Sequence, residues 1–571
     1  MAAPRVIVIG GGVAGLTVAH ELVDRGFSVE VYEARHDFGG KARSQFVRGT
    51  GKDGRHDLPG EHGFRFYPRF YRHVTGQMAK IPVGDRTVAD HLKPTSEAAI
   101  ALIDDGTWYR FSRKKLTTPY SVLESLEVFF QDLDFDAQDV AVFGAKLLQF
   151  ATASDERRLA EYEQVSWYQF LAAEQCSEKF RNQLRGIPRM MVAMDSMRGS
   201  ARTIGVITVQ LLRDFSYNGV QNDRTLGGPT TQIWIDPWLA HLRRLGVRYH
   251  LDAEILGIDY HRGAIRSVTV GSQGRVSRVV GDHFVAALPV ERLATLLTPA
   301  MIAADPALGK LSDLSEYTEW MNGIQFYLTE DRPLVHGHTV YMDSPWALTS
   351  ISQAQFWPHV DLSKFGDGRV RGIISVCVSD WDVPGSNGKR ADECTRDEIM
   401  AEVWKQLKES LNVGGEVVLR DDMLHHWFLD PAIEDTDPYR AGIETNAEPL
   451  LVNYVDTWRL RPEPASAIPN LFLASDYVRT TTDIATMEAA NEAARRAVNG
   501  ILAATGSRAE PCRLWNPYEP PVFAPWRAYD QARFDAGLPW EAPLDPEAHA
   551  ALEAADGVLG MMPGRLRILS G

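Results

Sequence analysis

The sequence has few cysteines and no long apolar run. Its four cysteines, at positions 176, 377, 394 and 512, are widely spaced and form no Cys-x-x-Cys pair, which argues against a disulfide framework or a zinc site. No run of 18 or more apolar residues occurs, so no membrane-spanning helix is expected. The first apolar segment is too short for a span and does not resemble a signal peptide. These absences favour a cytoplasmic protein.

The chain also lacks an excess of basic charge. Its 60 Lys and Arg residues face 75 Asp and Glu residues, for a net charge of -15, which argues against nucleic acid as a partner. No Gly-x-Ser-x-Gly element indicates nucleophilic hydrolysis. His425 and His426 have no Cys or carboxylate partner at ligand spacing, so no metal site is expected. The sequence itself gives no oligomeric state.

A dinucleotide-binding motif occupies the first 17 residues. Residues 6–9 are β-branched and predict a buried central strand, which runs directly into three glycines and a helix. In this motif Gly10 makes the tight turn and Gly12 lets the backbone approach a pyrophosphate. Gly15 lets the helix pack against the strand.

The helix after these glycines would bind phosphate through its first turn. The amides of Val13 and Ala14 point toward the phosphates, with the helix dipole behind them. A second strand in SVEVYEA ends at Glu33, whose carboxylate can accept hydrogen bonds from both ribose hydroxyls of an adenosine. The same carboxylate would repel a 2'-phosphate, so NADP is disfavoured.

The segment DFGGKARS, after Glu33, distinguishes FAD from NAD. Gly40 permits a second close backbone approach, and Lys41 and Arg43 bring positive charge toward phosphate oxygens. This segment resembles the GG-(R/K)-x-x-(S/T) element of the flavin amine oxidase and phytoene desaturase superfamily. The resemblance implies that the cofactor is FAD.

Two further segments resemble the same superfamily. In GEHGF, which contains Glu61, His62 and Gly63, the family places backbone and side chains against the flavin ring. Near the C-terminus, Asp476 matches the acid that meets the ribityl and phosphate region of the flavin. In the family the residue at Ile255 contacts the adenine through its main chain.

The helix expected after Thr486 would present its N-terminus to the flavin. Met487 and Glu488 open it, and a helix N-terminus at the pyrimidine ring would stabilise anionic charge on the reduced flavin. The chain departs from the family pattern at Ser475 and at the alanines of this helix, where glycine is common. These are exchanges between small residues, so close packing is expected to survive.

The expected fold class is α/β, with a discontinuous Rossmann-type FAD-binding domain and a mixed α+β substrate domain. Helices are expected in SVLESLEVFFQDL and VAVFGAKLLQFATA, and strands around Ile255 and in GIQFYL and GIISVCVSDW. The proline- and aromatic-rich end of the chain is expected to pack onto the body. The predicted boundaries are 1–78, 225–300 and 465–503 for the FAD-binding domain, 79–224 and 301–464 for the substrate domain, and 504–571 for the C-terminal extension.

The resemblance implies hydride transfer from a substrate C–H bond to flavin N5. Lys41 in GGKARS, the PGEHGFRFYPRFYRHV segment and the tripeptide at 236–238 are most similar to phytoene desaturases and to bacterial squalene-associated FAD desaturases and hydroxysqualene dehydroxylases. We therefore expect a desaturase or dehydrogenase for an apolar, isoprenoid-like small molecule. Oxygen and quinone are both open as electron acceptors.

Three alternatives remain open from the sequence. Amine oxidation is one, although MNGIQFYL lacks the lysine that many amine oxidases place near N5. A redox-neutral isomerisation or dehydroxylation is another, and a binding protein of the Rab GDP-dissociation-inhibitor type is the third. Tryptophans in the second half of the chain could cage an amine, line an apolar tunnel or simply fill the core: Trp234, Trp238, Trp320, Trp346, Trp357, Trp427 and Trp458.

His62 and Arg65 are the candidate catalytic residues. His62 could orient the flavin or move a proton, and Arg65 could hold a substrate anion; alternatively, both contact only backbone or cofactor. A peripheral membrane contact is a weak hypothesis, because the sequence shows no basic amphipathic helix to anchor the chain.

Overall fold

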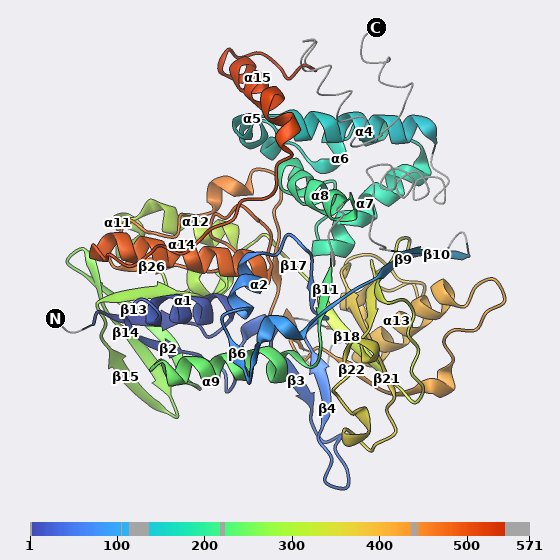
Figure 1. The fold of residues 1–571 in the computed structure, drawn as a ribbon, viewed down its shortest axis with the longest axis horizontal. Coiled ribbons are helices and arrows are strands. Elements are labelled where there is room, and N and C mark those ends of the chain that lie inside the picture. The colour runs from blue at the N-terminus through green and yellow to red at the C-terminus, as the bar shows by residue number, and fades with distance from the viewer. Residues whose placement is uncertain are drawn as a thin grey trace.

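Two β-sheets and a group of helices organise the chain (Figure 1). The structure is a computed structural model, and it describes residues 3–103, 106–112, 136–216, 223–434, 442–443 and 445–542. A five-stranded sheet lies at one end of the molecule and a seven-stranded sheet at the other, and helices of residues 137–216 lie along a third side.

The five-stranded sheet is parallel throughout, in the order β12-β2-β1-β16-β26. Its central strand β1 contains residues 6–9, whose side chains are fully buried. This confirms the buried central strand that the sequence predicts. The strands are β1 (Arg5–Ile9), β2 (Ser28–Tyr32), β12 (Arg248–His250), β16 (His283–Ala286) and β26 (Leu471–Leu473).

Both faces of this sheet are covered, because successive side chains of a strand point to opposite faces. Val6 and Val8 pack against one set of helices, α1 (Val13–Val23), α9 (Asp236–Arg244) and α14 (Met487–Thr505). Ile7 and Ile9 pack on the other face. That face is covered by β13 (Glu254–His261), β14 (Ala264–Ser272), β15 (Arg275–Val279), α10 (Val290–Ala294), α11 (Pro299–Ala304) and α12 (Pro306–Leu314). The α/β, Rossmann-type fold class is thus confirmed.

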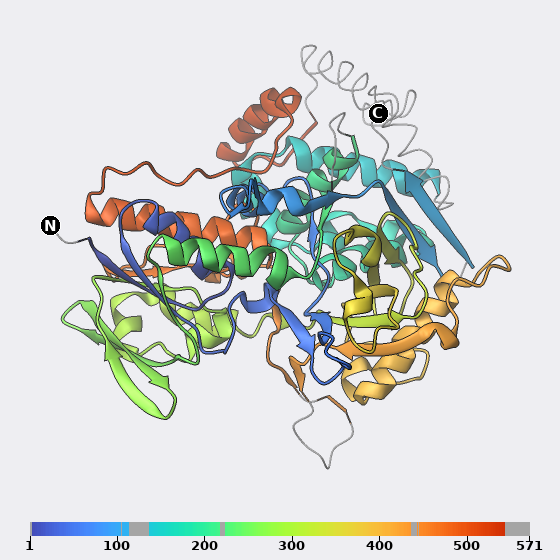
Figure 2. The same ribbon diagram turned by 60° about the horizontal axis from the view of Figure 1, so that its bottom comes forward.

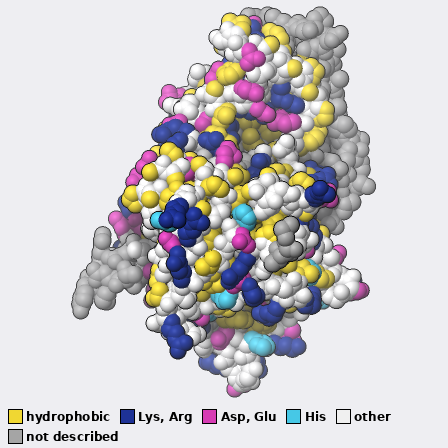
Figure 3. All heavy atoms as spheres, turned by 90° about the vertical axis from the view of Figure 1, so that its left-hand side faces the viewer, with side chains coloured by type: hydrophobic (Ala, Val, Ile, Leu, Met, Phe, Trp, Pro, Cys, Tyr) yellow, Lys and Arg dark blue, Asp and Glu magenta, His cyan; other side chains and the backbone are white. Residues whose placement is uncertain are grey.

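The surface beside this sheet has mixed polarity. Figure 3 shows basic, acidic and apolar side chains next to one another on this face. One such group is Glu30 with Arg5, Arg248 and His250 around it. Although burial alone would raise it, the pKa of Glu30 is held at about 2, because Arg5 and Arg248 stabilise the carboxylate.

The seven-stranded sheet has the order β10-β9-β19-β20-β21-β18-β22 and is antiparallel except between β9 and β19. Helix α13 (Arg396–Leu411) covers one face, against Ile324, Phe326 and Val376. Strands predicted in GIQFYL and GIISVCVSDW are confirmed as β18 and β21. The strands are β9 (Glu97–Leu102), β10 (Thr107–Ser112), β18 (Asn322–Leu328), β19 (Gly337–Tyr341), β20 (Thr349–Ser352), β21 (Gly372–Val378) and β22 (Leu424–Leu429).

Short strands join the two large sheets. A hairpin of β3 (Ser44–Val47) and β4 (Leu58–Glu61) leads into the segment GEHGF. Next to it, β11 (Arg224–Leu226) pairs with β5 (Phe66–Tyr67) and β8 (Leu92–Pro94). These strands hold GEHGF between the two sheets.

The described part of the third side contains five helices around an aromatic core. They are α4 (Ala137–Thr152), α5 (Asp155–Ala160), α6 (Trp167–Phe170), α7 (Glu178–Val192) and α8 (Ala201–Ser216). Helix α4 confirms the prediction for VAVFGAKLLQFATA, whereas SVLESLEVFFQDL lies outside the described residues. No described helix is both long enough and apolar enough to cross a bilayer.

The C-terminal extension packs on the body as far as residue 542, as its aromatic content predicts. It runs along α14 and ends in α15 (Ala524–Asp535), next to α4 and α5 (Figure 2). Asp530 is buried there and lies 2.8 Å from Nε of Arg157. Trp526 of α15 is also buried.

Candidate active site

A cavity of about 1130 Å³ lies between the five-stranded sheet, the seven-stranded sheet and helices α7 and α8. Single-ligand pockets typically measure roughly 300 to 1,000 Å³, so this cavity exceeds the usual range for one ligand. Most residues with a predicted role in cofactor binding line it: Gly10, Gly12, Val13, Ala14, Glu33, Gly40, Lys41, His62, Gly63, Ile255, Asp476 and Met487.

The turn after β1 requires glycine at two positions. Gly10 has a φ of 103°, and a β-carbon there would lie 2.4 Å from the carbonyl oxygen of Ala287. A β-carbon on Gly15 would lie 1.9 Å from the carbonyl oxygen of Gly10. Because glycine has no β-carbon, α1 can pack directly against the end of β1. Gly15 itself does not line the cavity.

The start of α1 is open toward the cavity. No side chain caps this helix at Gly12, and Val13 and Ala14 follow in the cavity lining. Gly40 faces Gly12, and a β-carbon on Gly40 would lie 3.0 Å from the α-carbon of Gly12. Free amides and a slot without side chains fit a pyrophosphate, which needs donors and close backbone approach.

Glu33 lies at the end of β2, at the edge of this slot. Its carboxylate accepts hydrogen bonds from the backbone N–H of Gly11 at 2.7 Å and of Arg35 at 3.0 Å. Two backbone donors fix its orientation, and Ile255 lies in the same part of the lining. This arrangement fits the ribose and adenine of a dinucleotide.

Lys41 and Arg43 differ in their surroundings. Lys41 lines the cavity and its Nζ donates to the carbonyl oxygen of Pro449. Arg43 is buried behind the lining, where Nη1 donates to Gly40 O at 2.7 Å and to Glu448 Oε1 at 2.9 Å. Its charge is thus paired within the protein, and it holds the Gly40 turn instead of pointing toward the cavity.

Arg65 links the two motifs that flank the cavity. Its Nη1 donates to Gly63 O at 2.7 Å and its Nη2 to Lys41 O at 2.8 Å. Of the two roles considered for Arg65, backbone contact is the one that the structure shows. The side chain fastens GEHGF to GGKARS.

Glu61 lies beneath the lining and does not reach the cavity. Its Oε1 accepts hydrogen bonds from Ser44 Oγ and Thr230 N, both at 2.9 Å. Burial raises the pKa of Glu61. The carboxyl group anchors the hairpin before GEHGF.

His62 faces the cavity with carboxylates behind it. Nδ1 lies 2.5 Å from Oδ2 of Asp430 and 3.4 Å from Oε2 of Glu448. Gly323 of β18 permits this placement, because its N–H donates to His62 O at 2.6 Å and a β-carbon there would collide with the same oxygen.

The N-terminus of α14 also faces the cavity, as the sequence predicts. Thr486 caps the helix by accepting a hydrogen bond from Ala489 N at 3.3 Å. Thr486 and Met487 line the cavity next to Asp476. The helix start and this acid would suit a flavin ring and its ribityl chain.

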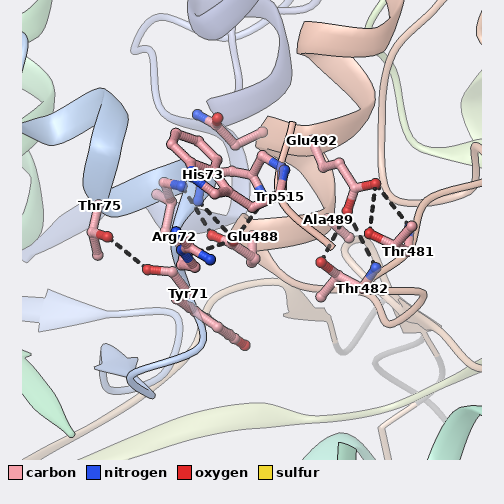
Figure 4. A network of polar contacts seen from close by, with 12 residues as sticks. Tyr71, Arg72, His73, Thr75, Thr481, Thr482, Glu488, Ala489, Glu492 and Trp515 are labelled. Carbon is pink, nitrogen blue, oxygen red and sulfur yellow. Dashed lines mark hydrogen bonds and ion pairs between the residues drawn. The ribbon is translucent and has the colours of Figure 1, made fainter. Parts of the chain in front are cut away.

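Glu488, the second residue of α14, does not line the cavity. It points away from the cavity and accepts hydrogen bonds from the backbone N–H groups of Arg72, His73 and Val74, at 2.7 to 2.9 Å (Figure 4). These amides start helix α2 (His73–Met78). Glu488 therefore ties α14 to α2.

One turn later, Glu492 fastens the loop before the helix. Its carboxylate accepts hydrogen bonds from the N–H and hydroxyl groups of Thr481 and Thr482, at 2.8 to 3.2 Å (Figure 4). The two glutamates together fix the position of the helix start.

The opposite end of the cavity, which we call the apolar chamber, is formed by the seven-stranded sheet and by α7 and α8. Most of its side chains are aliphatic or sulfur-containing, and no described tryptophan lines it. Trp234, Trp238, Trp346 and Trp357 are instead buried in cores. The chamber residues are Phe64, Phe66, Ala98, Ala99, Ile100, Ile187, Met190, Met191, Val192, Ile207, Leu211, Met321, His338, Val340, Met342, Thr349, Cys377 and Leu450.

No described group of three or more His, Cys, Asp or Glu residues is arranged to hold a metal ion. His425 pairs with Asp367, whose Oδ1 lies 3.0 Å from His425 Nε2. His426 lies beside the ring of Tyr327. The two histidines thus have separate surroundings.

Sequence reasoning missed Asp430 and Glu448. Each lies more than 360 residues from His62 in the chain, inside segments without a recognisable motif. Only the pairing of β18 with β22 and the loop before β25 (Leu450–Leu451) brings them behind His62.

Comparison with known sequences finds relatives among the desaturases. The chain is 24% identical to the 15-cis-phytoene desaturase of Synechococcus elongatus over 515 residues, 87% of this chain and 96% of the relative. A stretch of 60 residues is 50% identical to the zeta-carotene desaturase of Synechocystis sp., covering 10% of this chain and 12% of that protein.

Solved structures with a similar fold include amine oxidases. Putrescine oxidase bound to putrescine has a TM-score of 0.59 at 14% identity, covering 88% of this chain and 99% of that one. Cyclohexylamine oxidase from Brevibacterium oxydans has a TM-score of 0.58 at 15% identity, covering 88% and 100%. These identities show a shared fold and nothing finer.

The family described as flavin containing amine oxidoreductase matches residues 13–502. The match begins at the start of α1, includes the segments GGKARS and GEHGF and the start of α14, and covers every strand of both large sheets except β1. The chain belongs to this family, and it is an FAD-dependent oxidoreductase.

Proposed function

We propose that this enzyme is a desaturase or dehydrogenase for an apolar, isoprenoid-like substrate. FAD, when bound, accepts a hydride from a substrate C–H bond. The protein contributes position, exclusion of water and a place for the proton. The apolar chamber is the observation on which this proposal rests.

The cofactor would occupy the glycine-lined end of the cavity. The start of α1 and Lys41 would hold the pyrophosphate, Glu33 the adenosine ribose, and Asp476 the ribityl region. The N-terminus of α14 at Met487 would face the pyrimidine ring. Each of these groups lines the cavity.

The chamber would then hold the substrate. Long hydrocarbon chains bind by burial of apolar area, worth about 25 cal/mol per Å², and need few polar partners. The four methionines of the chamber, at positions 190, 191, 321 and 342, have flexible side chains that can adapt to a long substrate. The similarity to 15-cis-phytoene desaturase supports the same substrate class.

The chamber reaches the surface at α7. Ile187 and Met191 line it and are 36% and 37% exposed. Helix α7 also has basic residues, among them Arg181 and Arg185. The chain therefore has a basic amphipathic helix, contrary to the expectation from the sequence.

We propose that an apolar substrate enters the chamber at α7 from a membrane surface. Binding to vesicles that contain anionic lipid tests this proposal: the wild type is expected to bind and Met191→Glu is not.

Amine oxidation is the second candidate. Asp223 is a buried carboxylate in the cavity lining beside β11, and a carboxylate can bind a cationic amine. Against this role, the described lining contains no tryptophan and no lysine except Lys41.

A redox-neutral reaction on reduced flavin would use the same cavity and would differ only in the fate of the hydride.

Anaerobic mixing of the FAD-loaded enzyme with candidate substrates tests the proposal. Phytoene and squalene represent the isoprenoids, and putrescine and cyclohexylamine represent the amines. We expect the yellow flavin absorbance to disappear with an isoprenoid and to persist with both amines. Reduction by an amine alone would establish the second candidate.

A further inference from the structure

His62 lies beside two buried carboxylates that come from distant parts of the chain. Its Nδ1 lies 2.5 Å from Asp430 Oδ2 and 3.4 Å from Glu448 Oε2. Both carboxylate side chains are almost fully buried, whereas the imidazole remains 12% exposed at the cavity. The arrangement leaves Nε2 as the ring nitrogen available to the cavity.

The carboxylates are themselves held in place. Asp430 Oδ2 accepts from Asn322 Nδ2 at 2.7 Å, and its Oδ1 accepts from Gln45 Nε2 at 3.3 Å. Burial alone would raise the pKa of Asp430, but His62 and Asn322 outweigh this effect and the pKa is lowered. The two amide groups hold the Asp430 carboxylate in one orientation.

Guanidinium groups lie on the far side of Glu448. Arg43 and Arg35 both bind its Oε1, and Arg43 Nε also lies 3.6 Å from Oδ1 of Asp37. Burial would raise the pKa of Glu448, but His62, Arg43 and Arg35 lower it. Lys41 and Arg65 also line the cavity, and Arg65 Nη2 lies 3.8 Å from Oε2 of Glu61.

We propose that Asp430 and Glu448 make His62 the proton acceptor of the flavin cavity. The negative charge of Asp430, 2.5 Å from Nδ1, favours a proton on Nδ1, which leaves the lone pair on Nε2. His62 Nε2 would take the proton from the carbon next to the one that gives up its hydride to bound FAD, and a double bond would form between these two carbons. The two carboxylates stabilise the resulting imidazolium, as the aspartate does in a Ser-His-Asp triad.

The choice of C–H bond in this scheme rests on the proposed function, but the proton uptake by His62 does not. Any two-electron reduction of the flavin would draw the same proton onto Nε2. The role can therefore be tested without a substrate. His62 is a catalytic residue in this scheme, and Asp430 and Glu448 are positioning residues.

A second histidine–aspartate pair provides a matched control. His425 lies on β22, the strand that leads to Asp430, and pairs with Asp367 outside the cavity lining. Asp367→Asn removes a carboxylate from a histidine in the same region of the fold. It is expected to leave every flavin property unchanged.

The pH dependence of the flavin midpoint potential, measured with a chemical reductant, is the substrate-free test. A tenfold change in equilibrium constant corresponds to about 30 mV for a two-electron couple, so each proton taken up adds about 30 mV per pH unit. We expect about 60 mV per pH unit above neutrality for the wild type and Asp367→Asn, and about 30 mV for His62→Gln. An unchanged slope in His62→Gln would overturn the proposal.

Asp430→Asn and Glu448→Gln test the positioning residues. We expect flavin reduction by substrate to slow 100-fold or more in His62→Gln, about tenfold or more in Asp430→Asn and less in Glu448→Gln, with substrate affinity unchanged. If Asp430→Asn fails to fold, Glu448→Gln and His62→Gln still decide the outcome. If His62→Gln and Glu448→Gln both reduce the flavin as fast as the wild type does, the proposal is contradicted. If no isoprenoid reduces the wild-type flavin, the proposed function fails, but the pH dependence of the midpoint potential still tests His62.

Discussion

The two ends of the cavity are built in opposite ways. The cofactor end consists of short motifs, in which Gly10, Gly12 and Gly40 stand close together because backbone must approach backbone there. The apolar chamber is assembled from one to four side chains on each of several strands and helices, from Phe64 to Leu450. A site that binds through backbone is specified locally, whereas a site that binds through apolar side chains is specified by the whole fold.

This difference also determines tolerance to change. Replacing a glycine at the cofactor end introduces atoms where none fit, so both FAD binding and stability are expected to fall. Replacing a chamber side chain changes shape and polarity but leaves the framework intact. The four predictions below test this contrast, from the largest effect to the smallest.

Gly15→Ala is expected to abolish FAD binding and to destabilise the protein by about 3 kcal/mol or more, because the new β-carbon would lie 1.9 Å from Gly10 O. FAD content and chemical denaturation measure these effects. Gly144→Ala is the matched control, since Gly144 lies inside α4 with open space around it. Alanine there should be neutral or stabilise by about 0.5 to 1 kcal/mol; equal losses in both variants would refute the contrast.

Glu488→Gln is expected to destabilise the protein by about 2 to 4 kcal/mol. The amide would have one acceptor oxygen for three backbone donors and His73. Because the start of α14 would no longer be tied to α2, FAD affinity should fall at least tenfold, as measured by fluorescence of released flavin. Unchanged affinity would mean that this tie does not position the helix.

Met191→Glu is expected to weaken squalene binding about tenfold, roughly 1.4 kcal/mol, because it places a charge in the apolar chamber. Flavin difference spectra provide the dissociation constant. Met197→Glu is the control, since Met197 is exposed nearby but does not line the cavity. A similar loss in both variants would show that surface charge alone is responsible, and FAD content should be unchanged in each.

His20 gives the smallest effect, a dependence of stability on pH at the cofactor end. Its Nδ1 accepts from Trp238 Nε1 at 3.0 Å, and burial lowers the pKa of His20 to about 3. Because His20 stays neutral in the folded protein, its contribution to folding stability is complete above about pH 6.5. This stabilisation is lost as the pH falls from there toward 3. Between pH 7 and 6 the wild type should lose roughly 0.7 kcal/mol more than His20→Gln, as measured by denaturation at each pH.

The same contrast explains what the sequence could predict. The spacing of residues 6–15 and Glu33 predicts a dinucleotide site by itself, whereas the roles of GGKARS and the start of α14 followed from the resemblance to the superfamily. Their secondary structure was equally accessible, since buried strands and capped helices have local patterns. The parallel sheet and the fold class followed from these motifs and from the resemblance.

The remaining parts of the site depend on tertiary contacts. Arg43 and Glu61 belong to motifs at the cavity, but their side chains turn inward to Glu448, Ser44 and Thr230. Asp430 reaches His62 only because β22 pairs with β18. Neither spacing nor composition encodes such contacts, so the proton-acceptor site could not be found before the fold was known.

The most direct test of the account is anaerobic reduction of the FAD-loaded enzyme by substrate. The account predicts that a long isoprenoid hydrocarbon reduces the flavin and emerges with an additional double bond, and that Met191→Glu slows this reaction while putrescine and cyclohexylamine leave the flavin oxidised. Rapid reduction by an amine, with no reaction of phytoene or squalene, would contradict it.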